Sequence, residues 1–252
     1  MNPVVRKFLS ATVGRFPVTI RSGLGKGARC TAFPWASYWR GTHEPVVQQA
    51  IQRVVNQGAT GWSCWDLGAH FGLYSVALAR IVGPTGQVAA FEPNPLSYGR
   101  LELHKRMNRL PWLRLYPAAV SNFTGTAELL TYGNLDSTST HLKYADETLG
   151  ESAKPLGIRT VRLDDLVESG ELRAPNFVKI DVEGHAQQAL AGMAKTLSVS
   201  RPTFIIGLHS QDEVDGVLEA LVPLGYGWSA VVPSPIPDSM VGGDYLFTAA
   251  PR

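Results

Sequence analysis

Short apolar runs and helical stripes alternate along the first half of the chain. Ser63–Leu67 and Gln87–Phe91 are apolar segments of strand length, and helical spacing follows them over 73–81 and 96–108. Strands that alternate with helices predict a parallel sheet. Ahead of them, a helix that Pro45 opens is predicted from the apolar stripe Val46, Val47, Ala50, Ile51, Val54 and Val55.

The middle of the chain surrounds a long polar stretch with further strands. A third strand is predicted over 113–120, a β-like run over 126–132 and another strand over 158–163. Residues 133–157 are polar, and loops of this length in compact domains are often lids or binding loops. We therefore expect this stretch to cover one side of a ligand cleft, with a solvated connection as the alternative.

The C-terminal part predicts the close of the sheet. Its last two strands should form an antiparallel hairpin beside the parallel strands, so the expected fold class is α/β. The elements predicted here are a strand at Phe177–Ile180, a helix over 186–197, a strand at Thr203–Leu208, a helix over 214–224 that Gly225 ends, and strands over 226–232 and 245–249.

Composition narrows the class of protein. The chain has 252 residues, 44% of them hydrophobic, which is enough for one large core. A net charge of +2 implies neither nucleic acid nor an anionic membrane as a partner. The two cysteines, Cys30 and Cys64, predict neither a disulfide framework nor a zinc site. With no apolar run of about 18 residues and no signal-peptide pattern, we expect a cytoplasmic protein.

The turn between the first strand and its helix reads Asp-Leu-Gly-Ala-His-Phe-Gly, from Asp66 to Gly72. Glycine lets a ligand approach the main chain, and a helix N-terminus offers unpaired N–H groups. Asp66 would attract a cationic or hydroxyl-rich ligand, although an ordinary loop also fits a lone turn of this kind. Glu92 ends the next strand, where an acid can accept both hydroxyls of a ribose. The pair therefore predicts that a small molecule lies across the turn, with a ribose within reach of Glu92.

Four motifs occur in order: Trp-Asp-Leu-Gly-Ala-His-Phe-Gly-Leu-Tyr-Ser, Phe-Glu-Pro-Asn-Pro, Thr-Val-Arg-Leu-Asp-Asp-Leu and Val-Lys-Ile-Asp-Val-Glu-Gly-His. From about Glu44 to Thr248 the chain thereby resembles the FkbM family of S-adenosylmethionine-dependent methyltransferases. The resemblance implies a class I, Rossmann-like sheet of seven strands, mostly parallel, with helices on both faces. It also implies O-methylation of a hydroxyl on a sugar, glycan or secondary metabolite. Residues 45–252 would be the methyltransferase domain, with 1–44 packing on it or capping its site.

Carried over by position, the resemblance assigns the cofactor contacts. The turn would hold the cofactor, Glu92 the ribose, and the residues after it the adenosine, while Asp181 would face the methionine part or the reacting methyl. The residues so implied are Asp66, Gly68, Ala69, Gly72, Glu92, Pro93, Asn94, Ala119 and Asp181. The sequence departs from the family at His70, usually asparagine, and at Ala186 and Gly207, where glutamates are common. These departures put catalysis in doubt more than cofactor binding.

A hydroxyl acceptor must lose its proton, and histidine is the usual base near neutral pH. His185 and His209 each follow a strand, so both are candidates, with His185 expected to lower turnover about 10² to 10⁴-fold when replaced. A structural histidine is the alternative for each. Asp181 and Glu183 would point to opposite sides of an extended strand unless Gly184 bends it. Two acids are too few for a divalent cation, so no metal is predicted.

Two other classes of function remain open. Ala186 and Gly207 would fit a protein that binds the cofactor without catalysis. The sheet would also fit a nicotinamide-dependent oxidoreductase, although Asp66 stands where such enzymes usually place their first glycine. The identity of the acceptor and the oligomeric state are not predicted.

Overall fold

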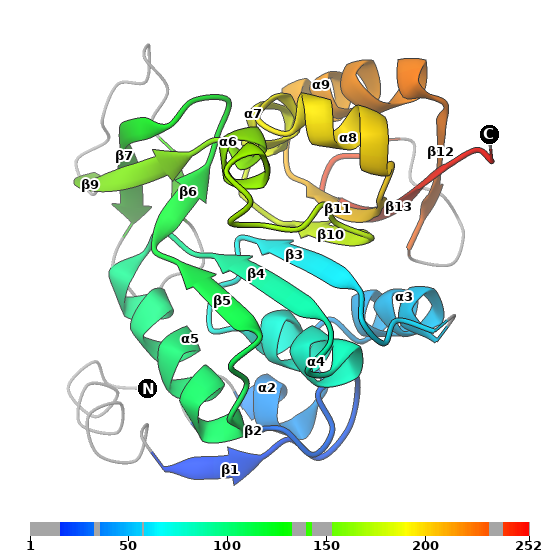
Figure 1. Cartoon of the computed structure of the whole chain (residues 1–252). Helices are drawn as coiled ribbons and strands as arrows, with labels where there is room; N and C mark the ends of the chain where they lie inside the picture. The colour runs from blue at the N-terminus through cyan, green and yellow to red at the C-terminus, as the bar shows by residue number, and fades with distance from the viewer. Residues whose placement is uncertain are drawn as a thin grey trace.

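The computed structural model describes residues 16–32, 36–56, 58–132, 140–142, 153–231 and 239–251. A seven-stranded sheet forms its centre, with helices on both faces (Figure 1). Five neighbouring strands run parallel, and β13 runs antiparallel to both of its neighbours. The predicted parallel sheet with an antiparallel closing hairpin is thereby confirmed. The order is β12 (Tyr226–Ala230), β13 (Gly243–Ala249), β11 (Thr203–Leu208), β10 (Phe177–Ile180), β3 (Ser63–Leu67), β4 (Gln87–Phe91) and β5 (Leu113–Tyr116).

Each face of the sheet has its own core. Successive side chains of a strand point to opposite faces, so Cys64 joins one core while its neighbour Trp65 joins the other. Helices α3 (Pro45–Val55), α4 (Leu73–Val82) and α5 (Pro95–Asn108) cover the first face. The second face is covered by α6 (Leu163–Glu168), α7 (Ala186–Ala191), α8 (Ala194–Ser200) and α9 (Gln211–Leu221).

The strand predicted over 113–120 is in fact two strands. Pro117 separates β5 from β6 (Ala118–Val120), because proline cannot donate a hydrogen bond to a sheet ladder. β6 leaves the central sheet and pairs with β9 (Ala153–Val161) in a second sheet of four strands, completed by β7 (Gly125–Tyr132) and β8 (Thr140–Leu142). β8 and the start of β9 occupy part of the stretch predicted as a lid, and its other residues lie outside the described ones.

Two predicted helices also differ in the structure. The helix over 186–197 is broken at Gly192, where a Cβ atom would lie 2.1 Å from the carbonyl oxygen of Ser121. That close approach admits only glycine, and the next residue, Met193, has φ of −123° and ψ of 21°, outside the helical range, so the segment divides into α7 and α8. Helix α9 begins before the predicted 214, because the Ser210 hydroxyl caps it by accepting from Glu213 N–H at 3.2 Å.

The described residues before α3 pack on the face that α4 and α5 cover. The hairpin of β1 (Pro17–Thr19) and β2 (Arg29–Thr31) is followed by α2 (Ala36–Arg40). His104 of α5 holds the hairpin, since its ring nitrogens contact Thr31 N at 3.0 Å and Phe71 O at 2.7 Å. Both cysteines are buried free thiols. None of the helices described has the length and hydrophobicity of a membrane span.

Candidate active site

A cavity of about 370 Å³ opens at the carboxyl ends of β3, β4, β10 and β11. Ligands of open α/β sheets bind at this edge. The cavity joins the turn after β3 to the segments that follow β10 and β11, which are far apart in sequence. Its lining includes Tyr38, His43, Glu44, Gly68, Ala69, His70, Tyr74, Glu92, Pro93, Ala119, Lys179, Asp181, Glu183, His185 and His209.

The turn after β3 requires its glycines for reasons other than ligand space. Gly68 has a φ of +81°, and a Cβ atom there would lie 1.9 Å from the carbonyl oxygen of Asp181. Gly72 has a φ of +82°, and its Cβ would lie 2.2 Å from Leu101. Gly68 and Ala69 line the cavity, whereas Gly72 does not. The glycines therefore bring β3, β10 and α5 close together, and only the first part of the turn faces a ligand.

Glu92 is the buried acid of this end of the cavity, at 6% exposure. Its two oxygens accept from His70 N–H at 2.7 Å and Asn94 N–H at 2.8 Å, so the carboxylate is held in place. Burial raises the pKa of Glu92 to about 7. Pro93 also lines the cavity, while Asn94 is buried as the N-cap of α5 and accepts from Leu96 N–H at 3.0 Å.

Asp66 lies behind the cavity wall. Its side chain is 1% exposed and accepts a hydrogen bond from the Ser75 hydroxyl, and it is absent from the cavity lining. Burial raises the pKa of Asp66, although Lys179 and Ser75 oppose that effect. The structure thus gives Asp66 a supporting place under the turn instead of the direct ligand contact that the sequence indicated.

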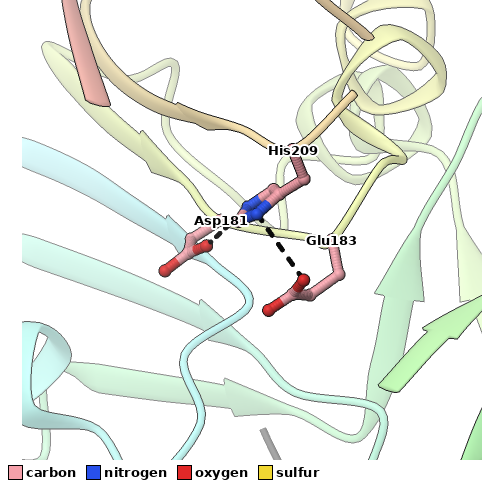
Figure 2. A group of neighbouring side chains, drawn as sticks. All are labelled: Asp181, Glu183 and His209. Carbon is pink, nitrogen blue, oxygen red and sulfur yellow. Dashed lines mark hydrogen bonds and ion pairs between the residues drawn. The ribbon is translucent and has the colours of Figure 1, made fainter. Parts of the chain in front are cut away.

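The other end of the cavity holds a cluster of two acids and a histidine (Figure 2). His209 Nε2 lies 3.2 Å from Asp181 Oδ1, and His209 Nδ1 lies 3.6 Å from Glu183 Oε2. Both carboxylates face the ring because the chain bends after β10, with φ of 48° at Glu183 and 91° at Gly184. The bend expected at Gly184 therefore begins one residue earlier. The bond to Asp181 raises the pKa of His209 to about 9, against burial, and Glu183 adds to the rise.

Lys179 supports this cluster from inside the sheet. Its ammonium group is buried 2.9 Å from Asp181 Oδ2 and lies over the ring of Tyr74. Burial alone would lower the pKa of Lys179, but Asp181, Asp66 and Glu44 outweigh it and hold the group charged. Burial likewise acts to raise the pKa of Asp181, yet Lys179 and His209 hold it well below its usual range.

His185 lies at the start of α7, 8% exposed, with Nε2 3.2 Å from the Ser121 hydroxyl oxygen. Burial lowers the pKa of His185 to about 4. Glu183 lies two residues earlier in the chain, but its carboxylate does not favour the protonated form of His185. The carboxylate of Glu183 faces His209 instead.

Glutamates are absent at two positions, Ala186 and Gly207, and the two positions lie in different surroundings. Ala186 is fully buried and is absent from the cavity lining, and its N–H donates to Glu213 at 3.0 Å. Gly207 lies beside the cluster: its Cβ would be 3.3 Å from Asp181 Oδ1, 3.4 Å from His209 Nε2 and 3.4 Å from Asp244 Oδ1. Asp244 is its partner on β13. An acid from the neighbouring strand thus lies where the side chain of residue 207 is missing.

Several lining residues come from parts of the sequence that showed no pattern. Tyr38 of α2 bonds His70 Nδ1 at 2.8 Å, and burial lowers the pKa of His70 to about 4. Glu44, just before α3, accepts from the Tyr74 hydroxyl at 2.7 Å and lies 3.3 Å from His43. Pro45 marked the helix start but could not reveal that Glu44 turns into a cavity.

Comparisons with known proteins show what the chain is similar to. A family model for the methyltransferase FkbM domain matches residues 66–227. The chain is 31% identical over 193 residues to the hexuronic acid methyltransferase AglP of Haloferax volcanii, covering 74% of this chain and 72% of that protein. The solved methyltransferase FkbM from Methylobacillus flagellatus KT shares the fold, with a TM-score of 0.52 at 16% identity. That match covers 75% of this chain and 44% of the solved one.

Proposed function

Because the chain belongs to the FkbM family and is an S-adenosylmethionine-dependent methyltransferase, we propose that it methylates a hydroxyl group of a sugar. One observation carries this proposal: a single cavity joins the buried carboxylate of Glu92 to the cluster of Asp181, Glu183 and His209. The name of the Haloferax volcanii relative, a hexuronic acid methyltransferase, supports a carbohydrate acceptor. Both free cysteines fit the cytoplasmic location expected from the sequence.

The residues at the Glu92 end fit the cofactor. A buried, fixed carboxylate at the end of β4 is suited to two ribose hydroxyls, and Gly68 and Ala69 present main chain to the same space. Among the described residues of the lining, Lys179 is the single lysine or arginine, whereas several carboxylates face the cavity. This charge suits a ligand that carries a sulfonium and an ammonium group. Pro93 and Ala119 would contact its adenosine. When bound, the cofactor supplies an electrophilic methyl group.

We place activation of the acceptor at Asp181, Glu183 and His209. In-line transfer requires the acceptor oxygen to be held against the methyl group with water excluded, and positioning can supply much of the rate. His209 faces both acids of the cluster, whereas His185 is buried against Ser121. Tyr38, His43 and Glu44 complete the wall, so the proposed capping role of 1–44 would help to exclude water.

Incubation of the purified protein with S-adenosylmethionine and a panel of hexuronic acids, neutral hexoses and their glycosides tests the proposal. We expect a methyl ether on one sugar class, with S-adenosylhomocysteine released in equal amount, both measured by mass spectrometry. Binding of the cofactor without methylation of any sugar would support a protein without catalysis. Binding of a nicotinamide cofactor in its place would overturn the proposal altogether.

A further inference from the structure

Three side chains of the acceptor end have the spacing of metal ligands. One ligand atom from each of Asp181, Glu183 and His209 lies within 4.8 Å of the other two. Ligand atoms on opposite sides of one divalent cation are about 4.4 Å apart, given metal–ligand bonds of about 2.0 to 2.2 Å. Small side-chain rotations would therefore let these residues share a cation.

The strand next to the cluster brings a further acid close to it. A Cβ atom at Gly207 would lie 3.3 to 3.4 Å from Asp181 Oδ1, His209 Nε2 and Asp244 Oδ1, so the absence of a side chain at 207 lets these three atoms gather around one point. Three polar atoms from three different strands or strand ends thus face one small space. Any larger residue at 207 would fill it.

The surrounding residues hold these candidate ligands in position. Lys179 binds Asp181 through Oδ2, which leaves Oδ1 directed at the cluster. The carboxylate of Glu213, 2% exposed, accepts from His209 N–H at 2.8 Å and from Ala186 N–H at 3.0 Å. It therefore ties the segment carrying His209 to the segment that follows Glu183. Such outer contacts are typical of metal sites, where they orient the ligands.

We propose that Asp181, Glu183 and His209 bind one divalent cation, with Asp244 as a nearby acid that strengthens the site. An imidazole combined with carboxylates suits Mn²⁺, Fe²⁺ or Zn²⁺ better than the all-oxygen surroundings that Ca²⁺ prefers. The prediction from sequence, that two acids are too few, omitted the histidine and the acid that β11 and β13 bring to the same place.

The role of the cation rests on the proposed function. Three protein ligands leave coordination positions open, and a hydroxyl oxygen of the acceptor can occupy one of them. A bound cation lowers the pKa of an oxygen ligand, so the O–H bond breaks, the proton passes to water, and the oxygen keeps the electron pair for the incoming methyl group. The hydroxyl is thereby activated without a proton acceptor on the protein.

Titration with Mn²⁺, followed by the electron paramagnetic resonance signal of the free ion, tests the site. We expect one Mn²⁺ bound per chain, with affinity at least tenfold weaker in Glu183→Gln and His209→Gln and weaker by a smaller factor in Asp244→Asn. Glu44→Gln is the matched control, because it removes one negative charge from the same cavity but no ligand. Its affinity should stay within about threefold of the wild type.

Two results would overturn the proposal: no Mn²⁺ bound by the wild type, or equal weakening in Glu44→Gln and Glu183→Gln, which would show general attraction of cations. The sugar panel keeps the proposals separate. Methyl transfer that persists at full rate in a protein shown to bind no Mn²⁺ removes the metal site and retains the function. Mn²⁺ bound at this site without any methyl transfer retains the site and removes the function.

Discussion

The two ends of the cavity are built in different ways. The end proposed for the cofactor comes mainly from one β–α–β unit, in which Gly68, Ala69, Glu92 and Pro93 follow neighbouring strands, and Ala119 of β6 joins them. The acceptor end gathers its polar groups from β10, β11, β13 and the segment before α3, so its members are distant in sequence. The first end depends on backbone shape, and the second depends on charges held in balance. Substitutions should therefore act on the first through close contacts and on the second through unpaired charges.

The largest effect is expected from Gly68→Ala at the cofactor end. The new Cβ would lie 1.9 Å from the carbonyl oxygen of Asp181 at a φ of +81°, so backbone strain adds to overpacking. The free energy of unfolding should therefore fall by about 4 kcal/mol. Gly225→Ala is the matched control, because φ is +78° and ψ is 31° there and the nearest atom to the new Cβ, Arg201 Nη2, lies at 3.5 Å; it should cost about 1 kcal/mol. Urea denaturation measures both, and equal losses would show that the close contact is unimportant.

Next in size is the loss of charge balance at the acceptor end. Asp181→Asn leaves the ammonium group of Lys179 buried beside a neutral side chain, and breaking a buried pair should lower the free energy of unfolding by about 3 kcal/mol. Lys179→Met together with Asp181→Asn should recover most of it, because neither charge then remains unpaired. A double variant no more stable than Asp181→Asn alone would contradict the charge account.

The two histidines should separate in turnover. His209→Gln should reduce kcat about 10²-fold on the acceptor that the sugar panel identifies, because His209 lies within the cluster. His185→Gln should reduce kcat less than tenfold and lower stability by about 1 kcal/mol, the value of its bond to Ser121. The reverse order would restore His185 as the base that sequence reasoning favoured.

A smaller effect is expected in the pH dependence of stability. The pKa of Glu92 is raised to about 7 in the fold, so its contribution to stability is complete below its ordinary pKa and is lost as pH rises through 7. Between pH 5 and pH 7 the free energy of unfolding of the wild type should fall by about 2 kcal/mol relative to that of Glu92→Gln. Urea melts of both proteins along this range measure the difference. A constant difference would mean that burial does not shift the Glu92 titration.

The two ends of the cavity also differ in how much of them the sequence predicted. The strands Ser63–Leu67, Gln87–Phe91, Phe177–Ile180 and Thr203–Leu208 were predicted with their observed limits, because fully buried strands leave a strong local pattern. Glu92 was placed correctly beside the turn for the same reason. The break at Pro117 and the second sheet were not foreseen, since short strands with partners far along the chain carry little local signal.

The acceptor end was predicted only in part. Asp181, Glu183 and His209 follow strands that the pattern located, and each was a candidate site residue, but their meeting at one point was not predicted. Asp244 was not a candidate, because its position beside Gly207 depends on the antiparallel register of β13 with β11. Glu44 depends likewise on how the N-terminal segment packs. Asp66 shows the opposite error. It lies within a motif and was expected to contact the ligand, but it is buried beneath the cavity.

Calorimetric titration with S-adenosylhomocysteine, on the wild type and on Glu92→Ala, tests most directly the claim that this cavity is the cofactor site. We expect one binding site per chain, and a loss of about 1.5 to 3 kcal/mol in Glu92→Ala, as for hydrogen bonds to a charged group. Glu168→Gln, a change in an exposed pair with Lys195, should bind like the wild type. No binding by the wild type, or the same affinity in Glu92→Ala, would contradict the account.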